Sequence, residues 1–409
     1  MKDLLILGAG TGGTTLANRM RRRLGREWRV RVVDPAPTHV YQPGLLFLPF
    51  GMTEVEDIVR PREGTLAAGV EWVRSEVAGL DGDRREVELV DGQRLRWDLL
   101  VIASGCELRP ELTPGLEGEG WREQVHEFYS LAGARALRDA LARFQGGRLV
   151  IAVVEPPIKC PVAPLELACL ADDALTQRGL RERTELVFVT PQPTLFAKPL
   201  ASERVTRLLE QKGVRIETGL ATSSVDGGGR VLRASDGSEL EFDLLVAVPA
   251  HRGARFVDQA GLGRRGYVAT DRATLAVAGL PDAFAMGDVT DLPTSKAGSV
   301  AHFQADVLSE NLERVIAGAA PEPTFDGHAN CFIETGHGKA MLLDFNYDTE
   351  PLLGRFPTPW GPFTLLEESR RNHWAKVAFR WLYWSALLPG RPLPLAPQMS
   401  MSGKRRPGA

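Results

Sequence analysis

The sequence has few cysteines, little net charge and no long apolar run, and each shortage excludes a class of protein. Its four cysteines, Cys106, Cys160, Cys169 and Cys331, are too few for a disulfide scaffold and lack metal-site spacing. The net charge of −3 gives no reason to expect nucleic-acid binding. No uncharged apolar run reaches the ~18 residues of a membrane-spanning helix, and no signal peptide precedes the first expected strand, which begins near Leu4. We therefore expect a globular protein that is kept in the cytoplasm.

The N-terminal residues have the pattern of a dinucleotide-binding unit. A short apolar strand leads directly into a glycine turn that contains Gly8, Gly10, Thr11 and Gly13, and a helix follows. Gly8 permits the tight turn, Gly10 lets the backbone approach a pyrophosphate, and Gly13 lets the helix pack on the strand. A second strand ends in Asp34, 21 residues after Gly13, where a ribose-binding carboxylate is expected. This order predicts a dinucleotide site, and the alternative is a tight turn without a ligand.

A second strand–helix–strand unit keeps its strand but lacks the glycine turn. The apolar strand over 148–154 is followed by Glu155 and two prolines, and no glycine occurs before Glu166. Prolines supply neither the N–H donors nor the positive φ of a phosphate-binding turn. Lys159 and Cys160 take the place of that turn. We therefore expect NADH and NADPH neither to bind well nor to act as donors. Cys160 becomes a candidate reactive group rather than a small buried hydrophobe, the alternative for any cysteine.

Two later turns are expected at the edge of the first sheet. Ser104 and Gly105 follow one apolar strand, and Gly287 and Asp288 follow another. Both turns have the small residues that a nearby cofactor needs, and both are expected to complete the first nucleotide domain. Cys106 lies beside the first of them, where a structural and a reactive role are both open.

The predicted fold class is α/β, with two Rossmann-like dinucleotide-binding domains and a C-terminal α+β membrane-docking region. A chain of 409 residues has room for two or three domains of about 150 residues each. The first domain is expected to be discontinuous, over 1–110 and 275–320. The second is expected over 111–274 and the third over 321–409.

The C-terminal segment is basic and aromatic. From Ser369 to the end there are eight Lys or Arg residues, at positions 370, 371, 376, 380, 391, 404, 405 and 406, and no acidic residue. The stretch 372–388 is too short and too charged to span a membrane. It suits an interfacial helix, with Trp and Tyr at headgroup depth and with Lys376 and Arg380 toward anionic lipid. The alternative is a helix packed in a dimer interface.

Together these motifs resemble the flavoprotein disulfide reductases with two dinucleotide-binding domains. The resemblance implies that the first glycine turn holds the ADP half of FAD and that Asp288 hydrogen-bonds the ribityl chain. Within that superfamily the chain looks most like a sulfide:quinone oxidoreductase. The segment from Lys159 to Glu166 matches the segment with one redox cysteine, and the segment from Asn330 to Gly336 matches the segment with the other.

That family resemblance implies a mechanism built on Cys160 and Cys331. When oxidised, the two are expected to form a disulfide or a sulfur-bridged pair, and sulfide attack leaves a persulfide on one and a thiolate on the other. Glu166 is the expected proton carrier. Lys159 and the following helix N-terminus are expected to lower the thiol pKa of Cys160. Lys376 is expected near the flavin or the quinone, as a lysine is in relatives.

The resemblance also implies the cofactor and partners. Related flavocytochrome c sulfide dehydrogenases attach FAD through a cysteine in the loop after the ribose acid, and here the loop over 35–44 has none. We therefore expect non-covalent FAD, sulfide as donor, quinone as acceptor, and peripheral attachment to the cytoplasmic face of the cell membrane. The oligomeric state stays open, a homo-oligomer included. The rival functions are a type II NADH:quinone oxidoreductase, a flavin persulfide reductase and a non-enzymatic FAD-stabilised membrane scaffold.

Overall fold

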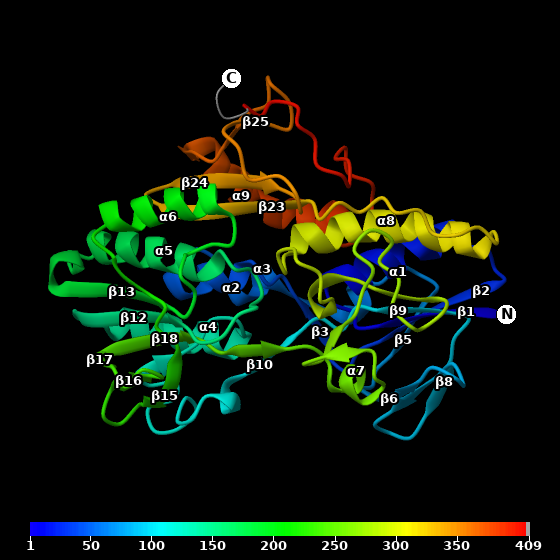
Figure 1. Ribbon diagram of the computed structural model, residues 1–409, viewed down its shortest axis with the longest axis horizontal. Coiled ribbons are helices and arrows are strands. Elements are labelled where there is room, and N and C mark those ends of the chain that lie inside the picture. Colours follow the sequence, from blue (N-terminus) through cyan, green and yellow to red (C-terminus); the bar gives the residue numbers. More distant parts are fainter. Residues whose placement is uncertain (406–409) are drawn as a thin grey trace.

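Two parallel sheets and one mixed sheet organise residues 1–405, the part of the chain that this computed structural model describes (Figure 1). The two parallel sheets lie side by side, and the C-terminal sheet covers one side of their junction (Figure 1). Arg406, one of the basic residues expected near a membrane, lies outside the described residues.

The first parallel sheet has the strand order β22-β9-β1-β2-β5. Its strands are β1 (Lys2–Leu7), β2 (Trp28–Val33), β5 (Val70–Val73), β9 (Leu99–Ile102) and β22 (Ala283–Ala285). Helices α1 (Thr11–Arg23) and α8 (Gly298–Ile316) lie over one face and contact each other (Figure 1). Because β22 pairs with β9, the chain returns to this sheet after building the second one, as the sequence predicts.

Shorter elements lie outside the first sheet in the segments that connect its strands to one another and to the second sheet. They are β3 (Thr38–Val40), α2 (Gly44–Phe47), η1 (Leu48–Phe50), α3 (Val55–Ile58), β4 (Val59–Pro61), η2 (Arg62–Thr65), the three-stranded β6 (Val77–Asp81), β7 (Glu86–Leu89) and β8 (Arg94–Arg96), and then η3 (Pro110–Leu112), α7 (Arg255–Gln259), β20 (Gly263–Arg264), β21 (Tyr267–Val268) and η5 (Gly287–Val289). The pair β6 and β7 is antiparallel, so these two strands form a hairpin.

The second parallel sheet has the order β11-β18-β12-β13-β14. Its strands are β11 (Val125–His126), β12 (Gly147–Val153), β13 (Thr184–Thr190), β14 (Arg215–Thr218) and β18 (Leu244–Val248). Its other elements are α4 (Leu131–Arg143), α5 (Ala163–Gln177), η4 (Arg181–Arg183), α6 (Pro199–Gln211), and the meander β15 (Thr222–Asp226), β16 (Val231–Ala234) and β17 (Glu239–Glu241). The antiparallel pair β10 (Glu107–Arg109) and β19 (Ala250–Arg252) connects the two halves.

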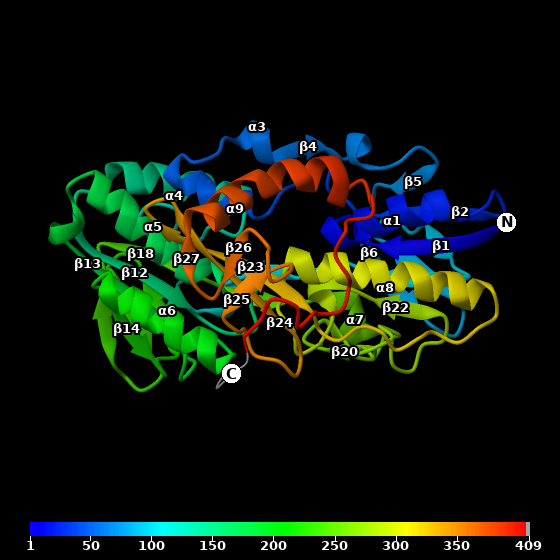
Figure 2. The ribbon, with the colours of Figure 1, turned by 90° about the horizontal axis from the view of Figure 1, so that it is seen from above.

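The third sheet is mixed and is followed by the last helix. Its strands are β23 (Ala329–Gly336), β24 (Lys339–Phe345), β25 (Gly354–Phe356), β26 (Phe363–Leu365) and β27 (Glu368–Ser369). Helix α9 (Arg370–Leu382) packs on β23 and β24 and continues into a π-helical turn, η6 (Tyr383–Leu387). The chain then crosses back to β25, where Gly354 bridges Lys404 (Figure 2). The predicted α/β class with two Rossmann-like sheets is therefore confirmed.

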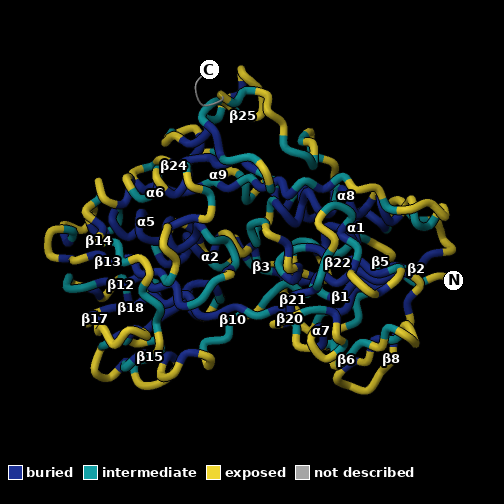
Figure 3. The backbone as a smooth tube through the Cα atoms, viewed as in Figure 1, coloured by how far each residue is buried: buried dark blue, intermediate teal, exposed yellow. Residues whose placement is uncertain are grey.

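Burial follows the strands. The central strands of both parallel sheets are buried while their outer loops are exposed (Figure 3). Continuous apolar runs such as Leu99–Ile102 belong to strands that are covered on both faces. Within residues 1–405, no helix combines the length and the hydropathy needed to cross a membrane.

Candidate active site

The glycine turn after β1 has the geometry that its sequence predicts. Gly8 has a φ of +104°, and a Cβ there would lie 2.5 Å from the carbonyl oxygen of Ala103. A Cβ on Gly13 would overlap the carbonyl oxygen of Gly8, so helix and strand approach as closely as only glycine permits. A Cβ on Gly10 would meet no atom within 4 Å. The space before the N-terminus of α1 is therefore open, and no side chain caps that helix.

Asp34 holds this turn from the end of β2. Its Oδ2 accepts a hydrogen bond from the Ala9 N–H at 2.7 Å, and its Oδ1 accepts one from Ala36 N–H at 2.9 Å. The buried Arg62 guanidinium lies 3.2 Å from Oδ1. The carboxylate thus stands beside the glycine turn, and its contact with a ribose remains a prediction.

Ser104 and Asp288, both predicted cofactor residues, lie at the same edge of the first sheet. The Ser104 Oγ is buried and has no hydrogen-bond partner among the described residues, and Gly105 has a φ of +71°. Asp288 lies in η5, where burial raises the pKa of its carboxyl while the Lys296 and Lys159 ammonium groups lower it. Lys296 Nζ also donates to the Asp288 carbonyl oxygen at 2.7 Å.

Cys160 and Cys331 come from distant segments and lie within electrostatic reach of each other. Cys160 lies between β12 and α5 with a φ of +44°, a conformation that a non-glycine residue adopts at a cost and that is common at functional sites. Cys331 lies on β23 and is buried. Burial raises the pKa of the Cys331 thiol, and the charge of Cys160 raises it further. All four cysteines lie within the described residues and are free thiols, so no disulfide joins this pair in the structure.

A buried ion pair stands beside Cys160. Lys376 reaches inward from α9, where its Nζ contacts Glu166 Oε1 and donates to the Phe332 carbonyl oxygen at 3.0 Å. The Glu166 side chain is only 2% exposed. Burial lowers the pKa of Lys376 to about 7, and the charge of Cys160 opposes that shift. An amine that titrates near neutral pH can exchange protons with a neighbouring thiol.

The cation that acts on Cys160 is not the one that the sequence suggested. Burial raises the pKa of Cys160, and this outweighs the lowering by Lys376 and by the backbone N–H groups of Val162 and Ala163 at the start of α5. The predicted helix N-terminus does act on the thiol, but the expected net lowering is wrong. Lys159, the predicted cation, acts instead on Asp288, because its backbone pairs with Lys296 on the other side of the turn.

Sequence reasoning missed an acid–histidine pair that continues from Glu166. The Glu334 N–H donates to Glu166 Oε1 at 2.6 Å, and Glu334 Oε1 lies 2.6 Å from His373 Nδ1. Burial raises the pKa of Glu334, whereas His373 lowers it. The near-neighbour spacing of His373 and Lys376 on one helix face was the only local signal.

Helix α9 is polar on the inside and apolar on the outside. Its inward side chains include Asn372, which is fully buried. Arg380 Nη1 lies 2.9 Å from Asp57 Oδ2. Its outward side chains include Trp374 and Trp381, which are 67% and 73% exposed. The expectation that Lys376 faces lipid is therefore wrong, because its side chain is buried and paired with Glu166. Arg380 is partly exposed and pairs with the exposed Asp57, so its expected position toward lipid stays a prediction. The aromatic residues just after the helix, Tyr383 and Trp384, are buried rather than at a surface.

The remaining predicted residues have structural partners. Thr11, the first residue of α1, hydrogen-bonds through its Oγ1 to the Tyr383 hydroxyl at 2.9 Å. Burial raises the pKa of Cys169 and of Cys106 to about 12. Cys169 is fully buried within α5, which favours its role as a small core residue.

The turn after β12, which has no glycine, carries an acidic residue that is neutralised by two arginines. The Glu155 carboxylate is not a free charge, because Arg252 Nη2 lies 2.8 Å from Oε2 and Arg265 Nη1 lies 2.7 Å from Oε1. Pro156 and Pro157 have no N–H groups, so this turn still lacks donors for a pyrophosphate.

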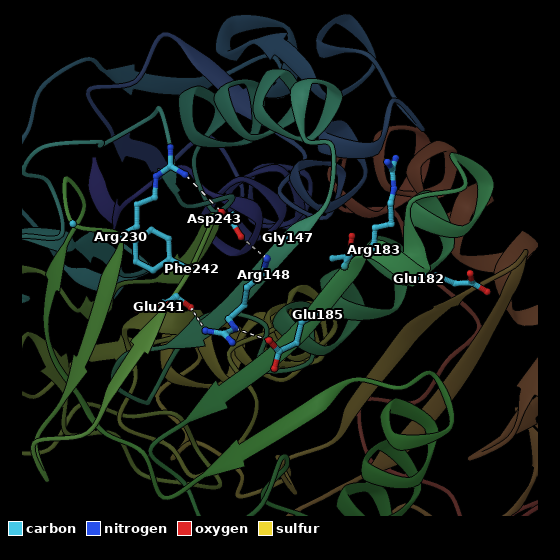
Figure 4. Close-up of a pocket in the computed structure, with 11 residues that line it drawn as sticks. Gly147, Arg148, Glu182, Arg183, Glu185, Arg230, Glu241, Phe242 and Asp243 are labelled. Atoms are coloured by element: carbon cyan, nitrogen blue, oxygen red, sulfur yellow. Dashed lines mark hydrogen bonds and ion pairs between the residues drawn. The ribbon is translucent and has the colours of Figure 1, made fainter.

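One open depression lies elsewhere, at the amino ends of the second sheet's strands. It has a volume of about 730 Å³. Its charged side chains pair with one another, with Arg148 Nε 2.6 Å from Glu185 Oε2 and Arg230 Nη1 3.6 Å from Asp243 Oδ1 (Figure 4). Parallel α/β sheets bind ligands at the carboxyl ends of their strands. All the predicted nucleotide and cysteine segments after β1, β9, β12 and β22 are at those ends, so we place the site there.

Comparison with known proteins agrees with this arrangement. The fold has two Rossmann-like units whose parallel sheets lie side by side. The family model of the pyridine nucleotide-disulphide oxidoreductases matches residues 2–306, and the chain belongs to that family of oxidoreductases.

The similar proteins also confirm the resemblance to sulfide:quinone oxidoreductases. The mitochondrial sulfide:quinone oxidoreductase of Mus musculus is 26% identical over 95% of this chain and 86% of the mouse protein. That of Schizosaccharomyces pombe is 27% identical over 93% of this chain and 89% of its own. The crystal structure of the sulfide:quinone oxidoreductase from the bacterium Aquifex aeolicus superposes with a TM-score of 0.80 at 19% identity, covering 96% of this chain and 92% of that one. The last comparison supports the fold.

Proposed function

We propose that the protein oxidises sulfide to polysulfide or sulfur and passes the electrons through FAD to a membrane quinone. The observation that carries this proposal is that Cys331 lies within electrostatic reach of Cys160, while Lys376, which pairs with Glu166, acts on the Cys160 thiol. The two cysteines come from separate sheets, and a dithiol next to a proton-exchanging amine is suited to sulfur redox chemistry.

The residues at the first sheet edge fit FAD. The uncapped N-terminus of α1 and the open space at Gly10 suit a pyrophosphate, and the partnerless Ser104 hydroxyl is free to hydrogen-bond a ligand. Gly8, Gly10, Thr11, Gly13 and Asp34 would hold the ADP half. Ser104, Gly105, Gly287 and Asp288 would hold the flavin half. FAD, when bound, accepts the electron pair from the sulfur site and yields it to the quinone.

The chain's own residues perform the sulfur steps. Hydrosulfide attacks the oxidised Cys160–Cys331 bridge, so that one S–S bond breaks and one forms, and a persulfide and a thiolate result. The Lys376 ammonium stabilises a thiolate on Cys160. Glu166 takes up the proton that the persulfide releases, while Lys376 stays protonated beside the thiolate. The bridge re-forms when the thiolate bonds to the outer sulfur of the persulfide: one S–S bond forms, the persulfide proton is lost, and two electrons pass to the bound FAD. The added sulfur is retained in the lengthened bridge.

Helix α9 is proposed to place the protein on the cytoplasmic face of the cell membrane. The apolar outer face of α9 carries Trp374, Val377 and Trp381 in exposed positions, and the two arginines before them, Arg370 and Arg371, are exposed as well. Indole rings favour the headgroup region and arginines favour anionic lipid. The proposed domain limits remain 1–110 with 275–320, 111–274 and 321–409.

The experiment that tests the proposed function replaces each cysteine separately. Cys160→Ser and Cys331→Ser should each abolish sulfide-dependent quinone reduction while FAD stays bound. Cys169→Ser is the matched control, because Cys169 is a core residue that the proposed reaction does not use. Turnover close to wild type in either of the first two variants, with FAD bound, would end the two-cysteine mechanism.

A further inference from the structure

One face of helix α1 is hydrogen-bonded to the C-terminal segment along its whole length. The four positions 11, 15, 18 and 22 share that face. Their bonds are Thr11 Oγ1 to the Tyr383 hydroxyl at 2.9 Å, Thr15 Oγ1 to the Leu387 carbonyl at 3.2 Å, Asn18 Nδ2 to the Leu388 carbonyl at 2.9 Å, and Arg22 to the Gly390 carbonyl. We call residues 383–390 the C-terminal brace.

The first bond of this stripe extends into a buried polar chain. The Tyr383 hydroxyl lies 2.9 Å from Thr11 Oγ1 and 2.6 Å from His39 Nε2. Tyr383 and His39 are both only 2% exposed. Burial lowers the pKa of His39 to about 4, with the Arg62 guanidinium adding to the shift, so the ring is neutral at neutral pH. A neutral ring nitrogen and two hydroxyls can satisfy one another without a buried charge.

The ring of Tyr383 is fixed by packing as well as by its hydroxyl. Its centroid lies 4.8 Å from that of Tyr41 and 5.1 Å from that of Trp384, and Arg60 lies over the Trp384 ring at 4.2 Å. A hydroxyl carried by such a ring stays in one place. It therefore holds the side chain of Thr11 in one orientation at the first residue of α1.

We propose that Tyr383 is a positioning residue for the cofactor: its hydroxyl orients Thr11 and the N-terminal turn of α1, and tight FAD binding depends on it. This inference rests on the FAD assignment in the proposed function. It extends that assignment because the phosphate-binding turn of the first domain is completed by a residue 372 positions further along the chain. The C-terminal brace, which directly follows α9, thus links that helix to α1 through these hydrogen bonds.

The test compares Tyr383→Phe with Tyr347→Phe, a matched loss of one hydroxyl. The Tyr347 hydroxyl donates to the Arg272 carbonyl oxygen at 3.1 Å and is not part of the brace. The purified full chain is dialysed to equilibrium against FAD, and the dissociation constant and the urea midpoint of the FAD-free form are measured. Tyr383→Phe should weaken FAD binding about tenfold, as expected for one or two buried hydrogen bonds, while Tyr347→Phe leaves it unchanged. A loss of stability without a change in FAD affinity would show a merely structural role and would overturn the proposal.

A double-mutant cycle tests the route through Thr11. Thr11→Val removes the partner hydroxyl, so adding Tyr383→Phe to it should cost little further affinity. If Tyr383→Phe still costs its full factor in that background, the proposed route is wrong. Failure of the wild-type chain to bind FAD would refute both this inference and the cofactor assignment, whereas binding that is indifferent to Tyr383 refutes only the inference.

Discussion

Replacing Lys376 by Met should make Cys160 a weaker nucleophile, and this prediction separates two lysines. In the structure Lys376 is the cation that lowers the pKa of Cys160, and Lys159 is not among the groups that act on that thiol. Lys159 is the immediate sequence neighbour of Cys160, so the sequence alone predicts that Lys159 lowers the pKa of this thiol. Lys159→Met is therefore the matched control.

The size of the effect follows from the loss of one nearby charge. A charge of opposite sign within ~4–6 Å shifts a pKa by about 1–3 units. We expect Lys376→Met to raise the pKa of Cys160 by about one unit or more, which reduces the thiolate near neutral pH about tenfold. Because Lys376 itself titrates at about 7, its ammonium is present below that pH and is lost above it. The difference between wild type and Lys376→Met should thus be largest below pH 7 and should shrink as pH rises.

The assay is the rate of alkylation by iodoacetamide as a function of pH. Cys160 is a partly exposed residue, so its alkylation can be followed in the folded protein. It is made the only thiol by replacing the other three cysteines, Cys106, Cys169 and Cys331, with Ser. Lys376→Met also leaves the buried Glu166 carboxylate without its cation, which costs about 3–5 kcal/mol in comparable buried pairs.

Combining Lys376→Met with Glu166→Gln removes the stranded charge, so stability should recover while alkylation of Cys160 stays slow. A slow rate in Lys159→Met together with a normal rate in Lys376→Met would refute the reasoning.

Three other predictions concern the glycine turn, the outer face of α9 and the chain's end. Gly10→Ala should fold normally and lose FAD, whereas Gly13→Ala should fail to fold, because only the second Cβ meets the backbone; urea midpoints and bound FAD distinguish them. Trp374→Ser should weaken binding to anionic vesicles without changing the urea midpoint, but Trp384→Ser should lower the free energy of unfolding by about 3–5 kcal/mol, as for a buried aromatic residue, and the urea midpoint with it. Lys404→Met should destabilise the fold by about 3–5 kcal/mol, because it removes the lysine that pairs with the buried Asp344 carboxylate and leaves that group only its contacts with His328 and Asn330; an unchanged urea midpoint would contradict this.

The elements that the sequence predicts best are those with local, periodic signals. The glycine turn with Asp34 could be predicted because strand, turn and helix are adjacent in the chain. Cys160 could be singled out because prolines replace the second phosphate turn. In both cases the backbone preferences of glycine or proline restrict the conformation of a single turn.

The relations that the sequence did not predict are contacts between distant segments. Nothing in the spacing of Tyr383 indicates that its hydroxyl meets Thr11. The aromatic and basic C-terminus predicted an interfacial helix with Lys376 toward lipid, yet Lys376 points inward and pairs with the buried Glu166. The composition of a segment does not predict which of its side chains are buried. That depends on the partners that distant segments place beside them.

This has a practical consequence for tests of membrane attachment. Cutting the chain before Asn372 would remove Lys376 and the whole C-terminal brace, so it would disturb the active site and helix α1 along with any docking surface. Substitution of the exposed Trp374 and Trp381 avoids that damage.

The central claim, that sulfide and not a nicotinamide is the electron donor, is tested most directly by anaerobic rapid mixing. The purified protein with bound FAD is mixed with micromolar sulfide in one experiment and with micromolar NADH in another, and flavin absorbance is followed. We expect rapid bleaching by sulfide and none by NADH, because the turn at Glu155, Pro156 and Pro157 lacks the N–H donors for a pyrophosphate. Rapid bleaching by NADH with sulfide inert would contradict the proposed function and indicate an NADH:quinone oxidoreductase.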